Sequence, residues 1–160
     1  AKHTVRPRQV LFHETLEQWP RVGARRLGRA LRGGLVGGEA PDDDASARQV
    51  MFGKSEPEGG LFRHEAGARL RVTYRVARPT LVTLQVMDHS IPDNVHADVT
   101  VTRAGLWSEL DVALERLADN AKKGRRVSPG DLLGYVTLRA AADAQGPVDL
   151  EVDEVTVYVP

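Results

Sequence analysis

Apolar and polar residues alternate along most of this chain, and a period of two residues predicts β-strands with one buried face. The clearest run is residues 149–160, where valines alternate with polar residues except at Asp153-Glu154. This shift of the pattern predicts a β-bulge in the middle of the strand. Because acidic residues are poor strand formers, we expect Asp153 to turn inward, toward a cation or a buried hydrogen-bond network.

Further strands are predicted wherever the same period recurs between turns. The short link at Arg78-Pro79 predicts that residues 70–76 and 81–87 form an antiparallel hairpin. Residues 115–123 are the only helix candidate and are too short to be stable alone. Eight or more short strands without helical periodicity predict an all-β fold, an antiparallel β-sandwich of about 8–10 strands with at most one short helix. The remaining predicted strands are 9–13, 29–32, 49–52, 95–101, 107–114 and 132–138.

Length and charge limit the range of functions. A chain of 160 residues fits one domain, and we expect a loose arm at 1–8 followed by a single domain at 9–160. Basic and acidic residues both number 22, which argues against nucleic acid or an anionic membrane as a partner. No apolar run is long enough to span a membrane. The start has neither a signal peptide nor Met, so we expect a processed or larger precursor.

The chain contains no cysteine, which excludes disulfides, thiolate metal sites and cysteine nucleophiles. The glycine-rich residues 21–38 contain neither of the common phosphate-binding motifs, so they are expected to form turns between strands. The acidic loop at 40–45 lacks the spacing of an EF-hand, and we expect it to be solvated.

Four segments, in this order, resemble one known superfamily. They are residues 12–17 with Trp19, residues 28–32, residues 69–76 with 105–107, and residues 151–157. Together they look like the galactose-binding-like β-jelly-roll superfamily, which contains many carbohydrate-binding modules of bacterial polysaccharide-degrading and envelope proteins. The resemblance implies a jelly roll with Trp107 buried between the sheets. It also implies a non-catalytic carbohydrate-binding or adhesion-type module of a larger extracellular or cell-envelope protein.

A structural calcium ties the first strand to the last in many such modules. Carried over by position, the resemblance implies Glu17 and Asp153 as ligands, with Glu14 as an alternative to Glu17. Calcium takes about six to eight oxygen ligands, and backbone carbonyls of the glycine-rich stretch could complete its shell. The chain departs from the family pattern at Leu16 and Glu154. A hydrogen-bonded Asp153 without a metal is therefore the other interpretation.

Two histidines near one predicted loop were the other metal candidate. Asp88-His89 and His96 with Asp98 could face each other and hold zinc or another transition metal. Spacing fixes no third ligand, so a solvated loop explains these residues better.

Catalysis on polysaccharides is the weakest of the functional interpretations. Glycosidases need two carboxylates across the scissile bond, and Glu109 and Asp111 share one face of a predicted strand. No acid–base pair stands out among the 22 acidic residues, and charges on an outer face explain this pair as well.

A polar face remains as the predicted binding surface. Because both tryptophans are expected in the core, Tyr135 is the aromatic residue left for it. Arginine binds carboxylates bidentately, so a uronate sugar would be a natural ligand. The expected partner is a glycan or, as an alternative, another protein that binds a spacer domain without any glycan. The predicted ligand-binding residues are Arg71, Arg75, Gln85, His96, Tyr135 and Arg139, with Thr73 and Asp98 on the same face.

Overall fold

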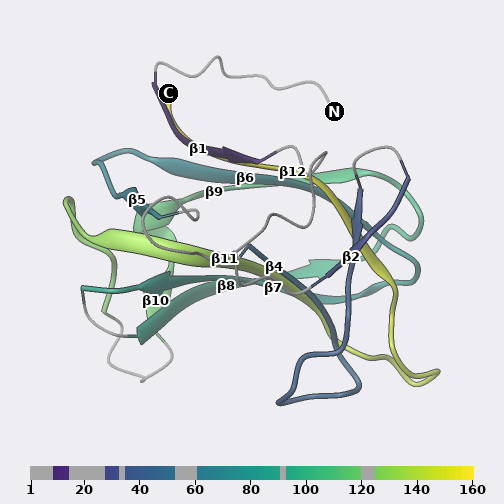
Figure 1. Cartoon of the computed structure of the whole chain (residues 1–160). Helices are drawn as coiled ribbons and strands as arrows, with labels where there is room; N and C mark the ends of the chain where they lie inside the picture. Colours follow the sequence, from purple (N-terminus) through teal and green to yellow (C-terminus); the bar gives the residue numbers. More distant parts are fainter. Residues whose placement is uncertain (1–8, 15–27, 33–34, 53–60, 91–92, 120–124) are drawn as a thin grey trace.

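Two antiparallel sheets packed face to face make up the fold (Figure 1). The computed structural model describes residues 9–14, 28–32, 35–52, 61–90, 93–119 and 125–160. Within these ranges there is one 3-10 turn, at Leu114–Arg116, and no α-helix. None of the described segments forms a helix long and apolar enough to cross a bilayer.

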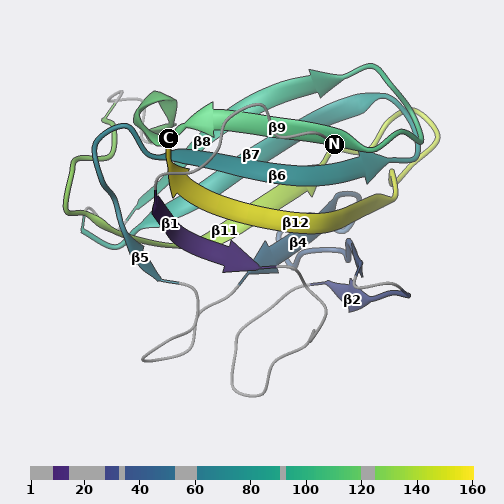
Figure 2. The same ribbon diagram turned by 90° about the horizontal axis from the view of Figure 1, so that it is seen from above.

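Sheet A is built around the C-terminal strand, β12 (Leu150–Val159). One edge of β12 pairs along nearly its whole length with β6 (Arg69–Val76), and β6 pairs in turn with β9 (Ser108–Ala113). Figure 2 shows β9, β6, β12 and β1 side by side in this layer. The other edge of β12 pairs with two shorter strands, β1 (Gln9–Glu14) and β3 (Val36–Gly37), and β2 (Arg29–Ala30) lies beyond β3.

Sheet B has the same plan around β11 (Leu132–Ala140). One edge of β11 pairs with β7 (Thr80–Asp88), which pairs with β8 (Asp93–Val101). The other edge of β11 pairs with β4 (Arg48–Phe52) and β5 (Phe62–Arg63), and β10 (Ala118–Asp119) lies beyond β8.

The hydrophobic core lies between the sheets, where alternate residues of each long strand point inward. In β7 these are Val82, Leu84 and Val86, which are fully buried, while the residues between them are only partly buried. Burying each such side chain contributes about 1.5–3 kcal/mol relative to leaving it exposed. The period-two pattern therefore predicted the buried faces correctly, and the all-β sandwich and its jelly-roll class are confirmed.

The predicted hairpin of residues 70–76 and 81–87 is wrong. β6 belongs to sheet A and β7 to sheet B, so the link at Arg78-Pro79 carries the chain across the sandwich. Both arrangements bury the same alternate residues, and the sequence pattern could not separate them. The strands that compete for β6, namely β12 and β9, come from much later in the chain.

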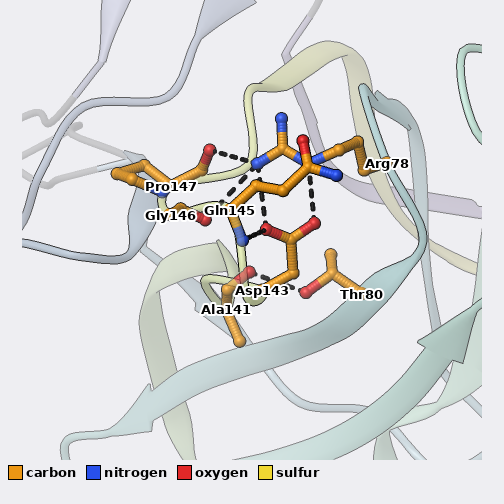
Figure 3. Close-up of polar contacts among 7 residues, drawn as sticks. All are labelled: Arg78, Thr80, Ala141, Asp143, Gln145, Gly146 and Pro147. Atoms are coloured by element: carbon orange, nitrogen blue, oxygen red, sulfur yellow. Dashed lines mark hydrogen bonds and ion pairs between the residues drawn. The ribbon is translucent and has the colours of Figure 1, made fainter.

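A cluster around Arg78 holds this crossing in place (Figure 3). The Arg78 guanidinium donates to both carboxylate oxygens of Asp143, at 2.6 and 3.1 Å, and to the carbonyl of Pro147 at 2.8 Å. The hydrogen bonds from Arg78 lower the pKa of the Asp143 carboxyl. Since Asp143 lies between β11 and β12, the cluster joins two of the connections that pass between the sheets, β6–β7 and β11–β12.

The helix candidate at 115–123 contains only part of a short 3-10 turn among its described residues. The 3-10 turn covers Leu114–Arg116, β10 follows at Ala118–Asp119, and residues 120–124 lie outside the described ranges. Leu114 and Leu117 are fully buried, so the short turn serves to place two apolar side chains in the core. The strands that the sequence did not predict (36–37, 62–63 and 118–119) have two residues each, too few to show a period.

Candidate functional site

A groove crosses the outer face of sheet B. Because Val82, Leu84 and Val86 point into the core, Thr83, Gln85 and Met87 of β7 point outward. The antiparallel register then places side chains of β8, β11 and β4 beside them. They line two overlapping hollows of about 350 and 490 Å³, which share Gln49, Gln85, Asn94, Thr137 and Arg139.

At one end of the groove, polar side chains around Arg139 are joined by hydrogen bonds. Arg139 of β11 lies beside Gln49 of β4 and Thr83 of β7. The Arg139 Nε donates to Gln49 Oε1 at 2.8 Å, and both terminal nitrogens donate to the carboxylate of Asp43 at 3.0 and 2.9 Å. Thr83, which is opposite Arg139 in the sheet, donates from its Oγ1 to Asp98 Oδ1 at 2.8 Å. The Arg139 hydrogen bonds lower the pKa of the Asp43 carboxyl.

The opposite end is aromatic. Tyr135 has a positive φ of 50°, the only such value among the described non-glycine residues, and a bulky residue in this region is strained. The register of β11 against β7 shifts at the same place, between Gly134 and Thr137. The tyrosine ring lies 5.6 Å from the ring of His89, with the planes inclined at 32°. Local strain of this kind is concentrated at functional sites, where it orients a side chain.

The middle of the groove is lined by amides and thioethers. Gln85 and Thr137 are directly opposite each other, Met51 is the next neighbour of Thr137, and Met87 faces Asn94. The distance from Tyr135 to Arg139 along β11 is about 13 Å, given about 3.3 Å per residue. The groove therefore offers an apolar end and a hydrogen-bonding end to one extended ligand.

Known proteins with this fold include modules that bind carbohydrate. A variant of a family 29 carbohydrate-binding module aligns with 97% of this chain and 88% of its own at 14% identity, with a TM-score of 0.54. BiXyn10A CBM1 aligns with 95% of this chain and 99% of its own at 9% identity, with a TM-score of 0.52. This chain spans 23% of the length of the agarase AgWH50C, at 9% identity and a TM-score of 0.54. No protein-family model and no curated protein sequence matches.

These likenesses establish the fold. The β-sandwich of the jelly-roll class that the sequence predicted is confirmed as the architecture. At these identities the likeness does not extend to a ligand or to single residues, so the site must be argued from its own geometry.

The predicted ligand-binding residues lie on both sheets rather than on one face. Gln85, His96, Tyr135 and Arg139 are on sheet B, and His96 is directly opposite Gln85. Arg71 and Arg75 are on β6 of sheet A and cannot reach the groove. The error follows from the wrong hairpin, which placed residues 70–76 and 81–87 in one sheet.

Both of these arginines have partners within sheet A. Arg71 is only 6% exposed, and its guanidinium carbon lies 4.7 Å from the centre of the Tyr158 ring. Arg75 donates to the carboxylate of Glu151 and lies over the Trp107 ring, 4.6 Å from its centre. These contacts explain the two arginines as parts of the sheet A surface.

Trp107 is not buried between the sheets as predicted. It is 37% exposed and lies just before β9. The residue that continues the inward alternation is Leu110, which is 8% exposed, so the core position was assigned to the wrong apolar residue. Trp19, the other tryptophan, lies outside the described residues.

The predicted metal ligands are only partly described. The bulge at Asp153 is confirmed by the register shift between Val152 and Glu154, and Asp153 is half-buried there. Glu14 pairs through its backbone with Val155, two residues from Asp153, while Glu17 lies outside the described residues. Among the described residues no three histidine or acidic side chains are grouped in a way that could hold a metal ion.

Glu109 and Asp111, the carboxylate pair considered for catalysis, lie on β9 of sheet A. Asp111 accepts hydrogen bonds from Arg69 Nε at 2.8 Å and from the Tyr158 hydroxyl. These bonds raise the pKa values of Arg69 and, together with burial, of Tyr158. Asp111 is thus part of a structural network.

Several residues of the groove were not predicted from the sequence. Asn94 and Met87 could have been found from the alternation of β7 and β8, because they have the same parity as Gln85 and His96. Thr137 shares the parity of Tyr135 and Arg139 and could have been found in the same way. Asp43, Gln49 and Met51 could not, since β4 and the 40–47 loop reach β11 only through long-range contacts.

Proposed function

We propose that the chain is a non-catalytic module that binds a glycan in the groove of sheet B. The observation that carries this proposal is the arrangement of Tyr135 and His89 at one end and amide, hydroxyl and guanidinium groups along the rest. A pyranose ring has an apolar face and a rim of hydroxyls. An aromatic ring covers the apolar face, while amide side chains exchange hydrogen bonds with the rim.

The solved structures support this proposal. The family 29 module and BiXyn10A CBM1 are carbohydrate-binding modules of about the same length with the same fold. The agarase contains a region of this fold within a much longer chain. We accordingly propose that this chain acts as part of a larger bacterial extracellular or envelope protein.

The test uses Tyr135→Gly, because glycine adopts a positive φ without steric cost and should preserve the backbone conformation of β11. Affinity electrophoresis through gels that contain neutral polysaccharides (xylan, galactan and agarose in turn) measures binding. Wild type should be retarded by at least one of them, and Tyr135→Gly should bind at least about tenfold more weakly, a change of about 1.4 kcal/mol. Trp107→Ala, a change of an exposed aromatic residue on the other sheet, is the matched control and should bind as wild type does.

Two results would contradict the assignment. Wild type that is not retarded by any polysaccharide argues against a glycan-binding module. Loss of binding in Trp107→Ala but not in Tyr135→Gly would move the site to sheet A.

A protein-binding or spacer function is the second candidate, and one surface favours it. Leu106 and Trp107 are 49% and 37% exposed. They adjoin a hollow of about 290 Å³ whose lining includes Arg75, Asp149 and Glu151. Exposed aromatic residues beside charged groups are common at protein interfaces.

We also propose the structural calcium between the first and last strands. Asp153 on its bulge would supply one carboxylate, and the pairing of Glu14 with Val155 brings the end of β1 close to it. A calcium there would hold β1 against β12; it would have no part in ligand chemistry.

A further inference from the structure

We propose that Asp43 sets the specificity of the groove: its carboxylate occupies the Arg139 guanidinium and so excludes glycans that carry uronic acids. The groove then selects uncharged glycans. This inference rests on the proposed function of the groove, and it reverses the expectation that its arginine attracts a uronate.

Both bidentate edges of the Arg139 guanidinium are already in use. The edge formed by the two terminal nitrogens is matched to the two oxygens of Asp43, at 3.0 and 2.9 Å. The Nε at the other edge donates to Gln49 Oε1 at 2.8 Å. A carboxylate gains most from arginine when it accepts two parallel hydrogen bonds. A uronate would therefore have to displace Asp43 or Gln49 to obtain them.

The loop that carries Asp43 is held in position. Its ends are fixed by Pro41 and Ala47, which are buried, and by the backbone pairing of Glu39 with Gln49. Within the loop, Asp44 accepts hydrogen bonds from the Ser46 amide at 3.0 Å and the Ser46 hydroxyl at 2.6 Å. Asp43 is thus presented to Arg139 by a loop with its own internal hydrogen bonds.

The charges around Arg139 also disfavour an anion. Apart from histidine, Arg139 is the one basic side chain among the described residues that line the two hollows of the groove. Asp43 neutralises it, Asp42 and Asp44 adjoin Asp43 in the loop, and Asp98 lies in the same row of the sheet. A displaced Asp43 would stay close and repel the incoming carboxylate. Specificity built on such a repulsive contact needs no loss of affinity for the intended ligand.

Asp43 contributes little to the stability of the fold. Its side chain is 69% exposed, and an ion pair this exposed adds little to the stability of a fold. The pair can therefore be removed without unfolding the domain, which makes the inference directly testable.

The experiment compares wild type with Asp43→Ala and with Asp42→Ala. Asp42 is exposed and its carboxylate makes no hydrogen bond or ion pair with a described residue, so Asp42→Ala removes the same charge from the same loop without freeing Arg139. The probes are polygalacturonate and the neutral polysaccharides named above, in affinity electrophoresis at constant ionic strength. Asp43→Ala should bind polygalacturonate at least about tenfold more tightly than wild type, since a charge-assisted hydrogen bond is worth about that factor or more. Asp42→Ala should stay near wild type, and adding Arg139→Gln to Asp43→Ala should abolish the gain.

The outcomes separate this inference from the proposed function. Binding of neutral glycans without any gain for Asp43→Ala overturns the exclusion and leaves the groove as a glycan site. An equal gain for Asp42→Ala would show a general charge effect and would also overturn it, as would strong binding of polygalacturonate by wild type. Failure of every variant to bind any glycan refutes the proposed function and the inference with it. Melting curves of all variants confirm that each is folded.

Discussion

The outer faces of the two sheets carry similar side chains and use them differently. On sheet A, the charged groups of β6 are paired with their neighbours on β9 and β12: Arg69 with Asp111, Arg75 with Glu151, and Arg71 with the Tyr158 ring. On sheet B, polar and apolar side chains line a groove, and one of them is a tyrosine with a strained backbone. Sheet A thus uses its polar groups to hold strands together, whereas the polar groups of sheet B line a groove on its outer face.

The difference has a structural origin in the two central strands. The bulge in β12, at Asp153, lies where β12 changes partner from β3 to β1, and the face there stays paired. The bulge in β11 lies at Tyr135, between the Gly134–Met87 pair and the Thr137–Gln85 pair and near the end of β7. One irregularity in a strand therefore serves pairing on one sheet and orients an aromatic ring on the other.

The largest expected effect is the loss of the sheet A network. Asp111→Ala leaves the buried Tyr158 hydroxyl and the Nε of Arg69 without their acceptor, while Arg69 Nη2 keeps its hydrogen bond to the backbone carbonyl of residue 111. We expect it to lower the free energy of unfolding by about 3 kcal/mol and to leave glycan binding unchanged. The matched variant on sheet B is Asp98→Ala, which is exposed and should cost no more than about 0.5 kcal/mol. Urea unfolding of both variants measures the difference. Equal losses of unfolding free energy would show that the polar groups of the two outer faces contribute equally to stability.

The second prediction concerns the proposed calcium between β1 and β12 of sheet A. If an ion binds between β1 and β12 in the folded state only, it stabilises by about 2.7 kcal/mol at a hundredfold excess over Kd. Calcium should raise the melting temperature, a chelator should lower it, and Asp153→Asn should remove the dependence. A wild-type melting curve that is the same in calcium and in chelator, combined with a destabilised Asp153→Asn, would favour a hydrogen-bonded carboxylate instead.

The part of sheet B near β5 contains a buried histidine. His64 follows β5 and is 1% exposed, and its two ring nitrogens make no hydrogen bond within the described part of the chain. Its amide donates to the carbonyl of Asp131 at 2.9 Å. Burial lowers the pKa of His64, although the charges of Glu115, Asp131 and Glu65 oppose this shift.

Stability should therefore depend on pH through this residue. The unfolded chain takes up the proton near pH 6.5 and the folded chain only at a lower pH. The contribution of neutral His64 is thus complete above that pH and declines as the pH falls toward the folded pKa. His64→Leu should change the free energy of unfolding at neutral pH by no more than about 1 kcal/mol and flatten the dependence between pH 7 and 5. Unfolding curves over this range measure it, and an identical slope in the variant would exclude His64 as the cause.

The smallest effect is expected at Trp107. Because its ring is exposed and contacts Arg75, Trp107→Ala should lower the free energy of unfolding by about 1 kcal/mol or less. A loss of about 3–5 kcal/mol, typical of a buried aromatic residue, would return Trp107 to the core. Arg75→Gln provides a second estimate of the same contact.

Alternation in the sequence was enough to find the long strands and their buried faces. Residues 70–76, 81–87 and 95–101 were assigned within two residues of their observed ends, and the bulge at Asp153 was placed correctly. These features depend on side chains two residues apart on one strand, and such spacing is visible in a single sequence. The strained Tyr135 was chosen only as the remaining aromatic residue, since a backbone angle leaves no mark in an alternating pattern.

Which strands pair was decided by the tertiary structure. A short link permits a hairpin or a crossing between sheets, and only the competition of β12 and β9 for β6 selects the crossing. The crossing between sheets places Arg71 and Arg75 on a different sheet from Gln85. Long-range pairing also brings Asp43 and Gln49 to the groove, although both lie nearly a hundred residues before Arg139 in the sequence. The alternation of a strand shows that one face is buried. It does not show what that face is buried against, because packing energy depends on contacts between segments distant in the sequence.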